Sequence, residues 1–183
     1  MSAKKRIDWK IHSSLLVLSF IIACVAYAEH STIHKDPHTY ILQKLQRNDI
    51  VLLGTRHQRK PILDFVSQLL PLLHETGTTH MGLEIASDQE STIESFIQTG
   101  KGLNKITIPS VIDCPEYRNM LRNIHSIDKR KRPAVIALDL PESLYGGEIN
   151  RDEWMARSIA KVFDHNPRAK VLVVVGNLHV LKK

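Results

Sequence analysis

The fold is decided by the stretch Lys170-Val171-Leu172-Val173-Val174-Val175-Gly176-Asn177-Leu178-His179, near the end of a 183-residue chain. As far as Val175 it is almost wholly apolar, which is typical of a strand buried on both faces. Three earlier runs are also strand candidates, at residues 49–53, 79–84 and 134–138. Strands of this kind occur in parallel sheets covered by helices. We therefore predict a three-layer α/β/α fold with a mainly parallel sheet.

Segments with apolar residues at helical spacing separate the strand candidates. Pro61 suits the first turn of one helix. Ser87 with Glu90, and Asn150 with Glu153, have the spacing of helix-capping pairs. Helices are expected over residues 61–74, 87–99, 115–125 and 150–163. We place one domain at residues 46–183, preceded by a linker or N-terminal extension at 29–45.

The N-terminus has the layout of an export signal. Residues 1–10 are polar and basic, 13–25 are apolar, and Ala26-Tyr27-Ala28 forms a small-x-small cleavage site. This order predicts a secretory signal peptide over residues 1–28. Two alternatives stay open, an uncleaved anchor and a lipoprotein signal in which Cys24 is acylated. We therefore expect an exported protein, periplasmic or a membrane-anchored lipoprotein, that meets the membrane only through its signal or lipid.

The composition is that of a soluble globular domain, with 43% hydrophobic and 24% charged residues. The formal charge of +6 falls to +3 without residues 1–28, and only 5% of residues are aromatic. These values argue against a nucleic-acid partner. A small-molecule or peptide substrate is the expected partner.

Chemistry-bearing residues follow each predicted strand. The first and last strands run into Gly-x-x-His, which ends at His57 and His179, and the second and third end at Glu84 and Asp139. Ligand sites in open parallel sheets lie beyond the carboxyl ends of the strands, so these four side chains should converge. Taken singly, each also fits an ordinary loop or capping role.

Two imidazoles and a carboxylate can hold a divalent transition metal that activates water. The predicted metal ligands are His57, Glu84 and His179. Glycines at strand ends leave space for a ligand. We therefore assign a ligand-binding role to Gly54 and Gly176, and also to Arg56, which stands between Gly54 and His57.

Arg151 stands in the first turn of a predicted helix, where a positive charge opposes the helix dipole. It is either a surface arginine offset by Asp152 and Glu153, or an anion-binding arginine at the sheet edge with Arg56 nearby.

Four segments resemble the superfamily of erythromycin esterases, ChaN-like haem-binding lipoproteins and TraB/Tiki proteins. They are residues 51–57, 82–84, 150–156 and 173–179, which together span nearly all of the mature chain. The resemblance implies a three-layer α/β fold and either metal-dependent hydrolysis or haem binding. Carried onto this chain, His57, Glu84 and His179 would be the functional positions.

The chain departs from this pattern in two places. Esterase and ChaN-like members have an acidic residue where this chain has Thr55, and threonine cannot act as a general base near neutral pH. The Gly-Thr-x-His form is closer to TraB/Tiki. The chain also stops four residues after His179, with no helix to cover the last strand. We therefore expect a C-terminally truncated member.

Three functions follow as hypotheses. The first is a metal-dependent hydrolase of an ester or amide, in which Glu84, Asp139 and Arg151 are the catalytic residues. The second is a haem or iron-uptake lipoprotein, as a homodimer, with His or Tyr side chains on iron and Arg56, Arg59 and Lys60 near the propionates. The third is a non-catalytic domain.

Overall fold

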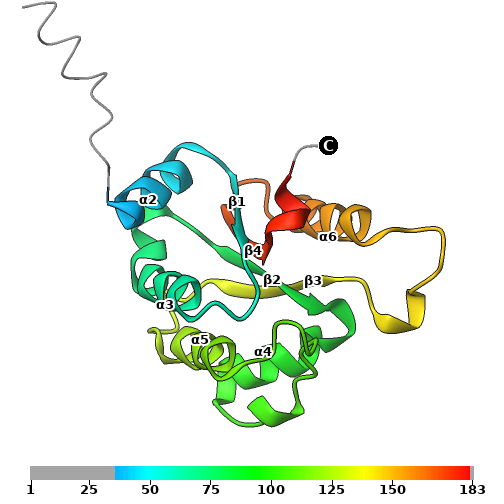
Figure 1. Ribbon diagram of the computed structural model, residues 1–183. Coiled ribbons are helices and arrows are strands. Elements are labelled where there is room, and N and C mark those ends of the chain that lie inside the picture. The colour runs from blue at the N-terminus through cyan, green and yellow to red at the C-terminus, as the bar shows by residue number, and fades with distance from the viewer. Residues whose placement is uncertain (1–35, 182–183) are drawn as a thin grey trace, which may run out of the picture. The chain divides into compact units, whose positions relative to one another are not determined.

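The computed structural model describes residues 36–181. The predicted signal peptide and Cys24 lie outside this range. The helices and strands, shown in Figure 1, are α2 (Pro37–Arg47), β1 (Ile50–Thr55), α3 (Lys60–Leu69), β2 (His80–Ala86), α4 (Glu90–Thr99), α5 (Pro115–Ser126), β3 (Ala134–Asp139), α6 (Arg151–His165) and β4 (Val171–Gly176). No helix in this part of the chain is long and apolar enough to cross a membrane.

The four strands form one parallel sheet in the order β1-β4-β2-β3. All four predicted strands are present, and the three-layer α/β/α prediction is confirmed. The expectation that β4 lies uncovered is wrong, because β4 pairs with strands on both sides and all six of its residues are buried. The edge strand β1 is the exposed one instead, with Leu52 51% exposed.

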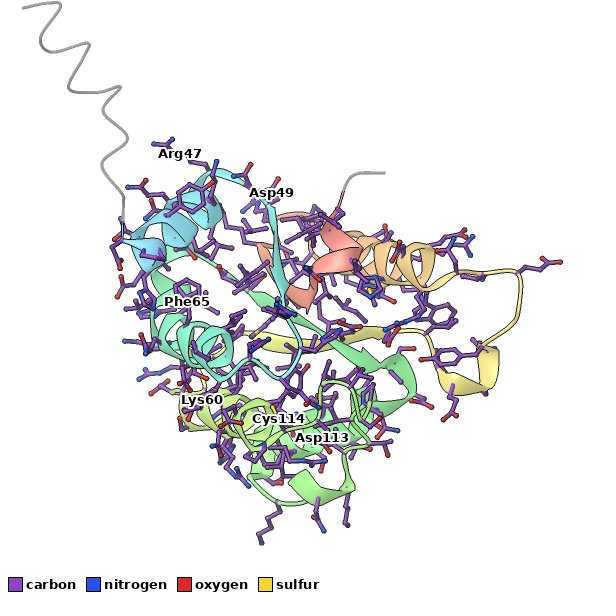
Figure 2. All side chains as sticks on the ribbon, in the orientation of Figure 1. Arg47, Asp49, Lys60, Phe65, Asp113 and Cys114 are labelled. Carbon is purple, nitrogen blue, oxygen red and sulfur yellow. The ribbon has the colours of Figure 1, made fainter. Side chains whose placement is uncertain are left out.

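Two hydrophobic clusters fill the spaces between the sheet and the helices on its two faces. Figure 1 shows the arrangement of these helices and strands, and Figure 2 shows the side chains that they carry. Residues of α2, α3, α4 and α5 build the larger cluster, which includes Leu83 and Val174 of the sheet. Met155 of α6 packs with Val171 and Val173 on the opposite face. Among residues 36–181, α6 thus lies on one face of the sheet, and α2, α3, α4 and α5 lie on the other.

The helix starts differ from the sequence expectation at two places. The capping pair of Ser87 and Glu90 does not form: Ser87 Oγ accepts from the Trp154 indole at 3.2 Å, and Glu90 Oε2 accepts the Ala137 N–H at 2.7 Å. Both side chains take partners that are distant in sequence, which a local pattern does not reveal. In addition, α2 begins inside the segment expected to be a linker, and its Leu45 is completely buried.

β2 is irregular where it reaches the site. Leu83 pairs with Ala137, but the next pair is Ala86 with Asp139, so the register shifts between them. Glu84 lies in this irregular stretch. Bulges of this kind re-aim a side chain and are frequent beside functional sites.

Candidate functional site

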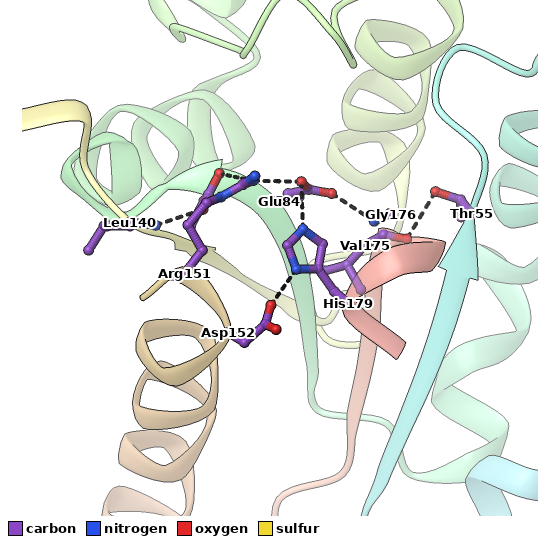
Figure 3. Close-up of polar contacts among 9 residues, drawn as sticks. Thr55, Glu84, Leu140, Arg151, Asp152, Val175, Gly176 and His179 are labelled. Atoms are coloured by element: carbon purple, nitrogen blue, oxygen red, sulfur yellow. Dashed lines mark hydrogen bonds and ion pairs between the residues drawn. The ribbon is translucent and has the colours of Figure 1, made fainter. Parts of the chain in front are cut away.

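The carboxyl ends of the strands carry a hydrogen-bonded group of charged residues (Figure 3). It consists of Glu84 from β2, Asp139 from β3, Arg151 and Asp152 from the start of α6, and His179 just after β4. We call these five residues the strand-end cluster. The predicted convergence of Glu84, Asp139 and His179 is therefore observed, because all the strands are parallel.

Glu84 is the centre of the cluster and is only 4% exposed. Its Oε2 accepts the backbone N–H of Gly176 at 2.7 Å, and its Oε1 accepts Arg151 Nη2 at 2.7 Å. His179 Nε2 lies 3.3 Å from the same Oε1. Three groups thus fix the carboxylate in one orientation.

Arg151 joins two buried carboxylates. The Asn150 side chain caps α6 by accepting the Glu153 N–H at 2.8 Å, which fixes the first turn that carries Arg151. From there Arg151 Nε and Nη2 bond both oxygens of Asp139, at 2.8 and 2.7 Å. These hydrogen bonds to Asp139, followed by the charge of Glu84, raise the pKa of Arg151 further above its usual range. The positive charge in the first turn therefore has protein carboxylates as its partners.

Asp139 is 1% exposed and also accepts the Leu140 N–H at 2.8 Å. Both of its oxygens are engaged by these donors. It therefore acts here as a positioning residue for Arg151.

His179 is held from both sides. Its Nδ1 lies 2.6 Å from Asp152 Oδ1, and its side chain is 16% exposed. Sequence reasoning used Asp152 only to offset the charge of Arg151. The sequence signal for Asp152 is its place next to Arg151 in the first turn of α6. Two neighbouring residues of that turn can reach the ends of two different strands, and Asp152 reaches His179 after β4.

His57 and Gly176 are placed against each other. A Cβ atom on Gly176 would lie 2.9 Å from His57 Nε2 and 3.3 Å from Glu84 Oε2. The glycine therefore gives the exposed His57 imidazole room beside the fixed carboxylate. Gly54 has a different role, because a Cβ there would lie 2.5 Å from Val180 Cγ2 and would obstruct the packing of the C-terminal turn. Arg56 is exposed.

Thr55 is buried, and its hydroxyl donates to the Val175 carbonyl at 3.1 Å. This bond ties the end of β1 to the end of β4. Thr55, which stands where esterase and ChaN-like proteins have an acidic residue, thus makes a structural contact.

The predicted metal ligands do not form a metal-binding arrangement. Among residues 36–181, no group of three or more His, Cys, Asp or Glu side chains is placed to hold a metal ion. The Asp152–His179 pair resembles the carboxylate–histidine contact common behind metal ligands. However, the Arg151 guanidinium bonds the same Glu84 oxygen that faces His179, and a cation placed there would meet this positive charge. The donor set in this arrangement does not fit a metal.

A small pocket of about 10 Å³ lies behind His57. Its lining includes Thr55, His57, Glu84 and Tyr117 of α5. The helical pattern predicts only a core position for Tyr117, and the side chain is indeed 5% exposed. The residue nevertheless contributes to the lining of this pocket, which the apolar periodicity of a helix cannot indicate.

Known proteins are similar to this chain in structure alone. No family model matches the sequence, and no curated protein is significantly similar to it. The solved structure of the type III effector HopBA1 superposes with a TM-score of 0.61 at 11% identity, over 78% of this chain and 72% of that chain. ChaN of Campylobacter jejuni, solved in a study of its cofacial haem binding, gives 0.51 at 12% identity, over 75% and 74%. The chain therefore has a ChaN-like fold.

Proposed function

We propose that the protein is a hydrolase of an ester or amide, with its active site at the strand-end cluster and His57. One observation carries the proposal: the exposed imidazole of His57 stands over Gly176, beside the fixed carboxylate of Glu84. A positioned imidazole can take a proton from water and return it to a leaving group.

The other residues have supporting roles. Glu84 is anchored by its donors and orients the neighbouring imidazole or the substrate. Arg151 bonds the carboxylates through Nε and Nη2, while its Nη1 makes no hydrogen bond with the described residues. Since the side chain is 40% exposed, Nη1 can donate to the carbonyl oxygen or to a negative charge on the substrate. No step is assigned to a metal, because the donor set does not fit one.

The test is hydrolysis of a panel of nitrophenyl esters and peptide amides by the full chain. Replacing His57 by Ala should lower kcat/KM about 10²–10⁴-fold. His165→Ala is the matched control, since His165 is an exposed imidazole at the far end of α6. Equal rates for the His57 and His165 variants would overturn the assignment. Absence of turnover in the parent would favour a non-catalytic domain.

Chelation separates the two kinds of hydrolase. Proton transfer through His57 needs no metal, so we expect the rate to survive treatment with EDTA. A rate that EDTA abolishes and Zn²⁺ or Mn²⁺ restores would instead support the metal-dependent hydrolase with His57, Glu84 and His179 as ligands.

Haem binding is the second candidate, favoured by the ChaN-like fold. Arg56 and Arg59 are exposed next to His57 and could meet propionates, whereas Lys60 already bonds Asp64 at 2.8 Å. Titration of the full chain with haem should then give a Soret shift that Arg56→Ala weakens. In either case we propose export through residues 1–28, which cell fractionation and N-terminal sequencing of the mature protein would test.

A further inference from the structure

Tyr117 carries a buried hydroxyl that the packing of the fold does not use. Its Oη atom is fully enclosed and has no hydrogen-bond partner within the described part of the chain. A buried hydroxyl without a partner destabilises a fold, and a phenylalanine would fill the same space. The hydroxyl therefore needs a partner that does not belong to the described residues.

The pocket lined by Tyr117, His57 and Glu84 can hold that partner. Its volume of about 10 Å³ is close to the room that one water molecule needs. Such a water also needs two to four polar neighbours. Tyr117, His57 and Thr55 all line this pocket, and their hydroxyl and imidazole groups can supply such neighbours.

The protonation state of Tyr117 decides its role. Burial raises the pKa of Tyr117 well above its ordinary value, and the negative charge of Glu84 raises it further. The phenol keeps its proton at neutral pH, so it is a hydrogen-bond donor and cannot act as the base. His57 remains the group that accepts a proton.

Resting on the hydrolase proposed above, we propose that the Tyr117 hydroxyl holds the attacking water next to His57. The water oxygen bonds to the carbonyl carbon while its proton passes to the His57 ring. The bond from that carbon to the leaving oxygen or nitrogen then breaks, and the leaving group takes the proton from His57. Tyr117 keeps its own proton throughout and positions the water.

Tyr117→Phe tests this role because it removes only the hydroxyl. We expect kcat to fall about 10- to 100-fold, the loss of one well-placed hydrogen bond, with KM changed less than about twofold. The melting temperature should not fall, because the hydroxyl has no hydrogen bond to the described residues that could be lost. The matched control is Tyr40→Phe, at a residue 49% exposed on α2. An unchanged kcat, or a lowered melting temperature with normal kcat, would overturn the proposal.

A high-resolution crystal structure provides a readout that needs no substrate. We expect a water within hydrogen-bond distance of Tyr117 Oη and a His57 ring nitrogen, and its loss in Tyr117→Phe. A pocket without this water in the parent protein overturns the inference even if the enzyme is active. If the parent hydrolyses nothing, the proposed function fails, and the crystal structure alone decides whether the hydroxyl binds water.

Discussion

Removing the charge of Arg151 should strongly destabilise the fold. Arg151 makes three charge-assisted bonds of 2.7–2.8 Å to Glu84 and Asp139, whose side chains are 5% and 1% exposed. Breaking a buried ion pair by deleting one partner costs about 3–5 kcal/mol. Arg151 is itself 40% exposed, and each carboxylate keeps a backbone N–H donor, so the expected cost is lower. We expect Arg151→Met to lower the free energy of unfolding by about 2–4 kcal/mol.

Urea unfolding measures this loss. For a domain of this size m is about 2 kcal/mol/M, so the midpoint should fall by about 1–2 M. Arg157→Met is the control on the same helix, because Arg157 pairs with Glu153 at 2.6 Å but the two side chains are 60% and 44% exposed. Its expected cost is below about 1 kcal/mol. Equal midpoints for the two variants would refute the conclusion that Arg151 compensates buried charge.

Three further perturbations test the surroundings of the cluster. Gly176→Ala should lower hydrolysis at least about tenfold, because the new Cβ lies 2.9 Å from His57 Nε2 and displaces the ring; wild-type rates would contradict this. Asn150→Ala should cost about 1 kcal/mol in urea unfolding, since it removes the cap on the Glu153 N–H, and a neutral result would show that the cap is dispensable. Burial lowers the pKa of His80 in the folded state. The contribution of His80 to the free energy of unfolding is therefore fully present above about pH 6.5 and is lost as the pH falls toward the pKa of the folded state. His80→Gln should therefore flatten the fall in stability as the pH is lowered below about 6.5, and an unchanged slope would contradict this.

The fold could be predicted because its determinants are local. A run such as residues 171–175 is apolar at every position, and this pattern indicates a strand covered on both faces wherever it stands in the sheet. The order of the strands in the sheet could not be predicted in this way. The position of β4 between β1 and β2 depends on how the crossovers pack, so the sequence suggested an uncovered last strand where the structure has the most buried one.

The site was predictable to the extent that it follows strand ends. Glu84 and His179 meet because Glu84 lies near the carboxyl end of β2 and His179 follows β4 in a parallel sheet, and this requires only the fold class. Arg151 and Tyr117 reach the same place from helices, and helical periodicity says which face is buried but not which strand end it meets. Glu84, the carboxylate expected to bind a metal, is thus neutralised by Arg151, which follows none of the strands. That guanidinium holds Glu84 and Asp139 in place, so the proposed hydrolase assigns proton transfer to His57. This proposal predicts that replacing His57 lowers the activity and that EDTA does not.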